Sequence, residues 1–168
     1  LAFRSASATA APEDLPRWIE DRLEEGAWAE AAAGYETLAE ALDAASRFAL
    51  AGDTWDRAAR ARARVDEAEA AFAARLGAAA SFLRAGDPEG ARTQLRRLPP
   101  DAAPLLHLRR ELLHARADLL SGLPRRAADR AASVTLHGAA GPSDRAFASL
   151  LRGEARLAAG DDPMAAAA

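Results

Sequence analysis

Five glycines divide this chain at intervals of 26, 34, 36 and 38 residues, and this spacing limits the folds open to it. Gly86, Gly122 and Gly160 begin nearly the same phrase, in which a proline follows within three residues and an alanine stands five residues on. Gly26 and Gly52 begin fainter copies of it. Repeats built from two antiparallel helices recur at roughly this interval. The spacing therefore predicts a stack of helical hairpins, with each glycine at a corner between two helices.

The stretch around Gly86 shows how such a corner is encoded. Apolar residues recur every three or four positions over residues 72–83, which gives one apolar helical face. Gly86 then ends the helix, because glycine adopts a left-handed conformation without steric cost. Asp87 can accept hydrogen bonds from the next helix, and Pro88 suits the first turn of that helix.

Composition supports an all-α fold and excludes several kinds of chemistry. Alanine dominates and β-branched residues are scarce, which favours helices that pack closely. All 22 basic residues are arginine, so no lysine is present for a phosphate-binding loop or a Schiff base. There is no cysteine for a disulfide or a thiolate ligand, and no run of eighteen apolar residues that would span a membrane.

Charge is unevenly spread along the chain. The net charge is −3, which gives no general attraction to nucleic acid. Residues 1–50 nevertheless carry four arginines against ten acidic residues, whereas residues 91–130 carry nine arginines against four. We expect a protein or peptide partner, possible self-association between these oppositely charged regions, and no nucleic-acid partner.

The register of small residues around the corners resembles the tetratricopeptide repeat (TPR) family. Ala79, Ala115 and Gly153 stand seven positions before Gly86, Gly122 and Gly160, and the alanine five positions after each corner completes the pattern. The resemblance is degenerate and covers nearly the whole chain. It implies antiparallel helical hairpins stacked as a right-handed α-solenoid with a concave groove.

One stretch of the sequence departs from a regular repeat array. No proline interrupts residues 55–85, which indicates a possible long helix there, or alternatively a break near Gly77.

We expect residues 1–15 to be a linker or a processed N-terminal segment, and residues 16–168 to be a repeat domain of a longer chain. The run Leu83 to Leu120 is similar to helical-repeat domains of bacterial cell-envelope proteins, which weakly favours the periplasm or cell envelope.

Few residues suggest catalysis or metal binding. His107 and His114 lie seven positions apart on one helix face, but metal-binding helices usually place their ligands closer, and nearby arginines would repel a cation. We interpret this face as polar surface and expect neither an enzyme active site nor a cofactor. Arg57, Arg60 and Arg64 form a stripe that we interpret as helix surface neutralised by nearby Asp and Glu.

The groove that the resemblance implies is the predicted binding surface. It would be lined by arginines and exposed apolar side chains suited to an acidic, partly apolar peptide. The predicted partner-binding residues are Arg84, Arg109, Leu112, Arg116, Leu120 and Phe147. An equally open interpretation is that these residues only face water. The chain is thus expected to be a non-catalytic protein-interaction scaffold of a bacterial assembly. The alternative is a regulatory or structural domain of a larger enzyme or transcription factor.

Overall fold

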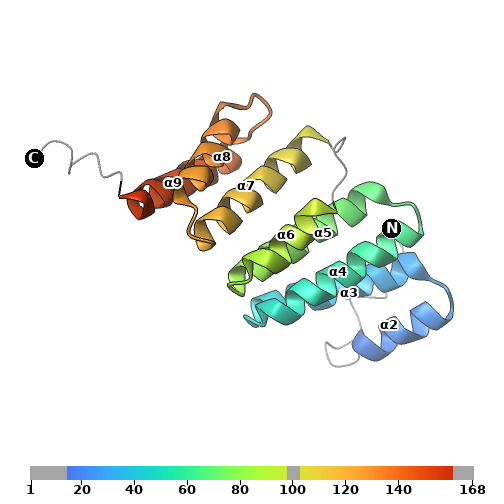
Figure 1. The fold of residues 1–168 in the computed structure, drawn as a ribbon. Helices are drawn as coiled ribbons and strands as arrows, with labels where there is room; N and C mark the ends of the chain where they lie inside the picture. The colour runs from blue at the N-terminus through green and yellow to red at the C-terminus, as the bar shows by residue number, and fades with distance from the viewer. Residues whose placement is uncertain (1–14, 98–102, 161–168) are drawn as a thin grey trace, which may run out of the picture. The chain divides into compact units, whose positions relative to one another are not determined.

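The computed structural model describes residues 15–97 and 103–160, and every element in these residues is a helix (Figure 1). The helices are α2 (Leu15–Glu24), α3 (Trp28–Ala44), α4 (Phe48–Arg64), α5 (Ala68–Arg84), α6 (Pro88–Arg96), α7 (Pro104–Leu120), α8 (Pro124–Leu136) and α9 (Pro142–Ala159). Each packs mainly against its neighbours in sequence, so the predicted all-α class and stacked hairpins are confirmed at this level.

The chain forms two compact units, Leu1–Ala85 and Gly86–Ala168, which we call the first and second units. Helices α2 to α5 belong to the first unit and α6 to α9 to the second. The predicted segment 1–15 lies outside the described residues except for Leu15, which begins α2. The alanine of the last repeat phrase, Ala165, also lies outside them.

Three of the five predicted glycine corners are confirmed, and the glycine of a fourth, Gly160, ends α9, while the residues after it lie outside the described ones. Gly26, Gly86, Gly122 and Gly160 each have a φ between +71° and +77°, the left-handed conformation for which glycine was expected. At the first corner the Ala27 amide donates a 2.8 Å hydrogen bond to the Arg22 carbonyl, which closes the end of α2. Asp87 also acts as the predicted cap, because its carboxylate accepts a 2.8 Å hydrogen bond from the Gly90 amide.

The fifth corner and the long helix were wrong predictions. Gly52 lies inside α4, and the chain turns instead at Ser46 and Asp66, whose φ angles are 59° and 57°. The Glu67 amide donates to the Arg62 carbonyl at 3.1 Å, so residues 55–85 contain two helices rather than one. The alternative break at Gly77 is also wrong, because Gly77 lies inside α5.

Glycines inside the helices of the first unit lie against aromatic rings. A methyl group built on Gly34 would lie 2.7 Å from the Trp18 ring, which is too close for any real contact. The corresponding distances are 2.8 Å from Gly52 to the Phe82 ring and 2.9 Å from Gly77 to the Trp55 ring. These glycines therefore allow a ring from a neighbouring helix to pack directly on the backbone.

Each unit has its own core. In the first unit alanines dominate, with Ala58, Ala59 and Ala74 packed beside the partly buried Tyr35 and Trp55. In the second unit the core includes Leu108, Leu112, Val134 and Leu151. Among the described residues, no helix is both long and apolar enough to span a bilayer.

A buried carboxylate joins three helices of the second unit. The Asp118 side chain, on α7, is almost fully buried. It accepts hydrogen bonds from Arg92 of α6 at 3.0 Å and from Arg130 of α8 at 2.9 Å, and Arg126 of α8 lies 3.2 Å away. A buried charge requires such partners, and here they come from the helices on either side in sequence.

Candidate functional site

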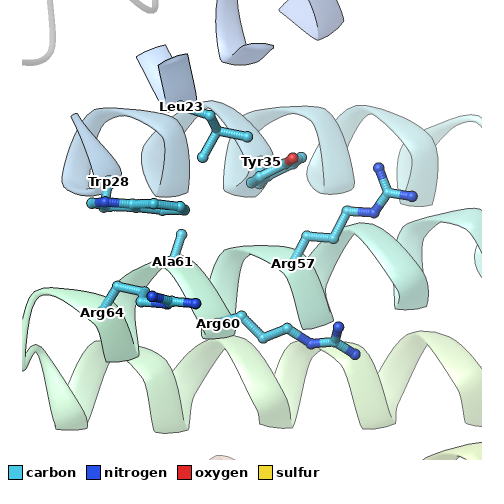
Figure 2. Close-up of a pocket in the computed structure, with 7 residues that line it drawn as sticks. All are labelled: Leu23, Trp28, Tyr35, Arg57, Arg60, Ala61 and Arg64. Atoms are coloured by element: carbon cyan, nitrogen blue, oxygen red, sulfur yellow. The ribbon is translucent and has the colours of Figure 1, made fainter. Parts of the chain in front are cut away.

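A hollow with converging charged and aromatic groups lies in the first unit, between the end of α2, α3 and α4 (Figure 2). Its volume is about 230 Å³. Its lining residues are Leu23, Trp28, Tyr35, Arg57, Arg60, Ala61 and Arg64. Figure 2 shows Leu23, Trp28 and Tyr35 on one side of the hollow and the three arginines on the other.

Helical periodicity places these groups together. Trp28 begins α3 directly after the Gly26 corner, and Tyr35 follows seven residues later, so both rings lie on one face of α3. Arg57, Arg60 and Arg64 have offsets of three and seven residues and lie on one face of α4. Packing of α3 against α4 brings an aromatic row next to a basic row.

The three arginines differ in their partners. Arg60 forms an ion pair with Asp56 one turn earlier. Arg64 places its guanidinium carbon 5.3 Å from the centre of the Trp28 ring, within the range of a cation–π contact. In the parts of the chain that the structure describes, no carboxylate forms an ion pair with Arg57 or Arg64. Within the described residues, the hollow therefore holds two arginines without an ion pair beside aromatic surface.

The predicted neutralisation of this stripe was thus right for Arg60 alone. Arg62, which the spacing places to the side, does pair with acidic residues. Its guanidinium donates to both Glu36 carboxylate oxygens, at 2.9 and 2.8 Å, and to Glu67 at 2.6 Å. Hydrogen bonding to Glu36 raises the pKa of Arg62 above its ordinary value. Arg62 therefore engages Glu36 and Glu67 outside the lining of the hollow.

The predicted groove residues are divided between the two units. Arg84 belongs to the first unit, where its guanidinium lies 3.3 Å from Asp43 and 5.4 Å from the Phe48 ring centre. Arg109 is exposed on α7, and Arg116 pairs with Glu154 of α9. These contacts bring Arg116 to α9 and Arg84 to α3, each within its own unit.

The predicted apolar members of the groove also differ among themselves. Leu112 is only 4% exposed and packs in the core of the second unit, so it presents no surface to a partner. Leu120 and Phe147 are exposed, on α7 and α9 respectively.

Arginines lie near His107 and His114, and the carboxylates of Glu111 and Asp118 also act on His114. Arg110 places a guanidinium nitrogen 2.9 Å from His107 Nδ1. Burial lowers the pKa of His114, and the charge of Arg130 lowers it further. No cluster of three or more potential metal ligands occurs within residues 15–97 and 103–160.

Comparison of the chain with protein-family models, with curated proteins and with solved structures finds no match. The site is therefore judged on its own geometry. Sequence reasoning identified the arginine stripe but did not connect it with Trp28 and Tyr35. The available signal was the offset of seven residues between the two aromatics in the helix before the stripe.

Proposed function

We propose that this chain is a non-catalytic, TPR-like protein-interaction scaffold whose first unit binds an acidic, partly apolar segment of another protein. The observation that carries this proposal is the hollow in which Trp28 and Tyr35 lie beside Arg57 and Arg64, neither of which forms an ion pair with a described carboxylate. Stacked helical hairpins are also the architecture that the resemblance associates with peptide binding, and we propose a right-handed superhelix on that basis alone.

The size of the hollow favours a side-chain anchor over a small-molecule ligand. Pockets for small molecules usually enclose roughly 300–1,000 Å³. The hollow measures about 230 Å³ and lies open to solvent, so it holds one or two side chains of a longer segment.

The chemistry of the walls specifies those side chains. Arginine guanidinium groups bind carboxylates through paired hydrogen bonds, and this pairing gives geometric selectivity as well as attraction. The rings of Trp28 and Tyr35 and the side chain of Leu23 offer apolar contact next to those donors. An aspartate or glutamate beside a leucine or an aromatic residue therefore matches both walls.

Selection from a library of random twelve-residue peptides displayed on phage tests this proposal. We expect the selected peptides to carry carboxylates next to apolar residues and to bind more weakly as salt rises. The Arg57→Glu/Arg64→Glu double variant should reduce their affinity at least about tenfold, as should Trp28→Ala. Selected peptides without acidic residues would contradict the proposal.

The matched control is the Arg17→Glu/Arg47→Glu double variant. It changes the net charge of the first unit equally, through two exposed arginines outside the hollow. We expect it to retain most of the affinity. Equal loss in both double variants would show that only overall charge matters, which would overturn the assignment of the hollow.

A further inference from the structure

The two ends of the hollow in the first unit carry the same pair of chemical groups. Trp28 of α3 and Arg64 of α4 lie at one end, where the Arg64 guanidinium carbon is 5.3 Å from the centre of the Trp28 ring. Tyr35 of α3 and Arg57 of α4 line the other end (Figure 2). Each end therefore offers an aromatic ring together with a guanidinium group that forms no ion pair with a described carboxylate.

The stretch between these ends is apolar. Ala61 lies between the two end arginines along α4, lines the hollow and is 4% exposed. Leu23 of α2 lines the hollow on the side of the rings (Figure 2). Arg60 also lines the hollow, but its guanidinium already pairs with Asp56. The hollow thus has two separate places for a carboxylate, one at each end.

The ends are equally far apart on both walls. Residues seven positions apart on a helix point in nearly the same direction, and about 10.5 Å separates them along the axis. This spacing applies to Trp28 and Tyr35 on α3, and equally to Arg57 and Arg64 on α4. A ligand that engages both ends must therefore repeat its acidic and apolar side chains at about this interval.

Backbone geometry limits which kind of segment has such a repeat. In a polyproline II helix, residues three positions apart lie on the same face, about 9 Å apart. In a β-strand, residues on the same face are about 7 or 13 Å apart. An α-helix repeats at about 10.5 Å, but a docking helix lays a continuous apolar face into a hydrophobic groove, whereas one wall here consists mainly of arginine. Polyproline II geometry fits best, because its three rows of side chains let an acidic row and an apolar row face different walls.

We propose that the partner segment binds as a short polyproline II helix with two carboxylates three residues apart, one for Arg57 and one for Arg64. The residue next to each carboxylate is apolar and lies against Tyr35 or Trp28. The third residue of each turn faces solvent. This inference rests on the proposed function, because it specifies the spacing within the acidic segment that the hollow binds.

Fluorescence anisotropy with a series of labelled peptides tests the spacing on the whole chain. Each peptide has the same composition, with two glutamates, a leucine after each glutamate, and an alanine–serine background. The glutamates stand two, three, four or seven positions apart. We expect the peptide with a spacing of three to bind at least about fivefold more tightly than the others. Tightest binding at two or four would indicate a β-strand and at seven an α-helix, and either result would overturn the proposal.

A second pair of peptides tests the backbone conformation. Both have glutamates three positions apart, and the solvent-facing residue of each turn is proline in one peptide and glycine in the other. Proline restricts the free peptide to extended conformations, so less entropy is lost on binding. We expect the proline peptide to bind at least about threefold more tightly. Equal affinity of the two peptides would overturn the assignment of a polyproline II conformation.

Charge exchange tests whether each end holds its own carboxylate. In Arg64→Glu, we expect binding to be restored when one of the two peptide glutamates is replaced by arginine. In Arg57→Glu, the other peptide glutamate should be the one whose replacement restores binding. The matched control is Arg17→Glu, an exposed arginine outside the hollow, which should leave the affinity for the original peptide unchanged. Rescue of both variants by the same peptide substitution would overturn the assignment of two ends.

The peptide series also separates this inference from the proposed function. If no acidic peptide binds, the proposed function fails and the spacing fails with it. If acidic peptides bind with equal affinity at every spacing, and Arg57→Glu/Arg64→Glu still weakens them, the proposed function holds and the inference of two carboxylates three residues apart is wrong.

Discussion

At the scale of the residue, replacing a glycine inside a helix with alanine changes the free energy of unfolding in two opposite ways. The helix propensity improves, but the added methyl group overpacks wherever an aromatic ring lies against the glycine. For Gly77→Ala we expect a net loss of up to about 2 kcal/mol in the free energy of unfolding. Overpacking against the Trp55 ring costs about 1–3 kcal/mol, and improved helix propensity recovers about 1 kcal/mol. Urea denaturation followed by tryptophan fluorescence measures this change.

The matched substitution is Gly153→Ala, where no ring opposes the added methyl group. Here only the propensity term acts, so the free energy of unfolding should rise by about 0.5–1 kcal/mol. Circular dichroism at low protein concentration, where self-association is negligible, is the appropriate measurement. Equal effects at Gly77 and Gly153 would contradict the role assigned to the aromatic contacts.

Individual side chains also show how far the candidate site was predictable. Spacing alone placed Arg57, Arg60 and Arg64 on one helix face, and it identified Asp56 as a partner within reach of Arg60. It could not show that Trp28, on another helix, would lie beside Arg64. It also could not show that Arg62 would engage Glu36 across helices. Contacts between helices depend on the packing register, which periodicity within one helix does not specify.

At the scale of the helix, the corners of the first unit differ in backbone strain. Ser46 and Asp66 adopt a left-handed conformation that costs a residue with a side chain about 1–2 kcal/mol. We therefore expect Asp66→Gly to raise the free energy of unfolding of the first unit by about 1 kcal/mol, as measured by urea denaturation. Gly26→Ala is the opposite change at an equivalent corner with open space around it, and it should lower stability by a similar amount. If Asp66→Gly is destabilising, the side chain of Asp66 makes a contribution larger than the backbone strain.

These two corners explain why the second hairpin was mispredicted. Four helix ends carry the expected glycine, but Ser46 and Asp66 occupy the same conformation without it. Following glycine alone therefore placed a corner at Gly52, which instead lies inside α4 beneath Phe82. The helices themselves begin at Trp28, Phe48, Ala68 and Pro88, twenty residues apart each time, and this regular interval was the better signal.

At the scale of the whole molecule, two spectroscopic probes can follow the unfolding of the two units separately. All three tryptophans, Trp18, Trp28 and Trp55, lie in the first unit, so their fluorescence reports the unfolding of that unit. Circular dichroism reports the helices of both. Substitutions confined to the second unit can therefore be compared by two probes with different coverage.

Asp118→Ala is the substitution that makes this comparison decisive. Removing the buried carboxylate leaves Arg92, Arg126 and Arg130 close together, with an expected loss of about 3 kcal/mol from the second unit. This value is at the low end for a broken buried pair, because the three guanidinium groups are partly exposed. The matched control is Glu154→Ala, which removes a partly exposed pair with Arg116 and should cost about 0–1 kcal/mol.

Because each unit has its own core, we expect Asp118→Ala to separate their transitions in urea. Circular dichroism should show an early phase that the native chain lacks, while the midpoint of tryptophan fluorescence stays in place. If both probes move together instead, the two units unfold as one cooperative system, as stacked repeats do when the interface between neighbours is strong. The same pair of measurements thus decides whether the two units, which packing divides between Ala85 and Gly86, also unfold independently.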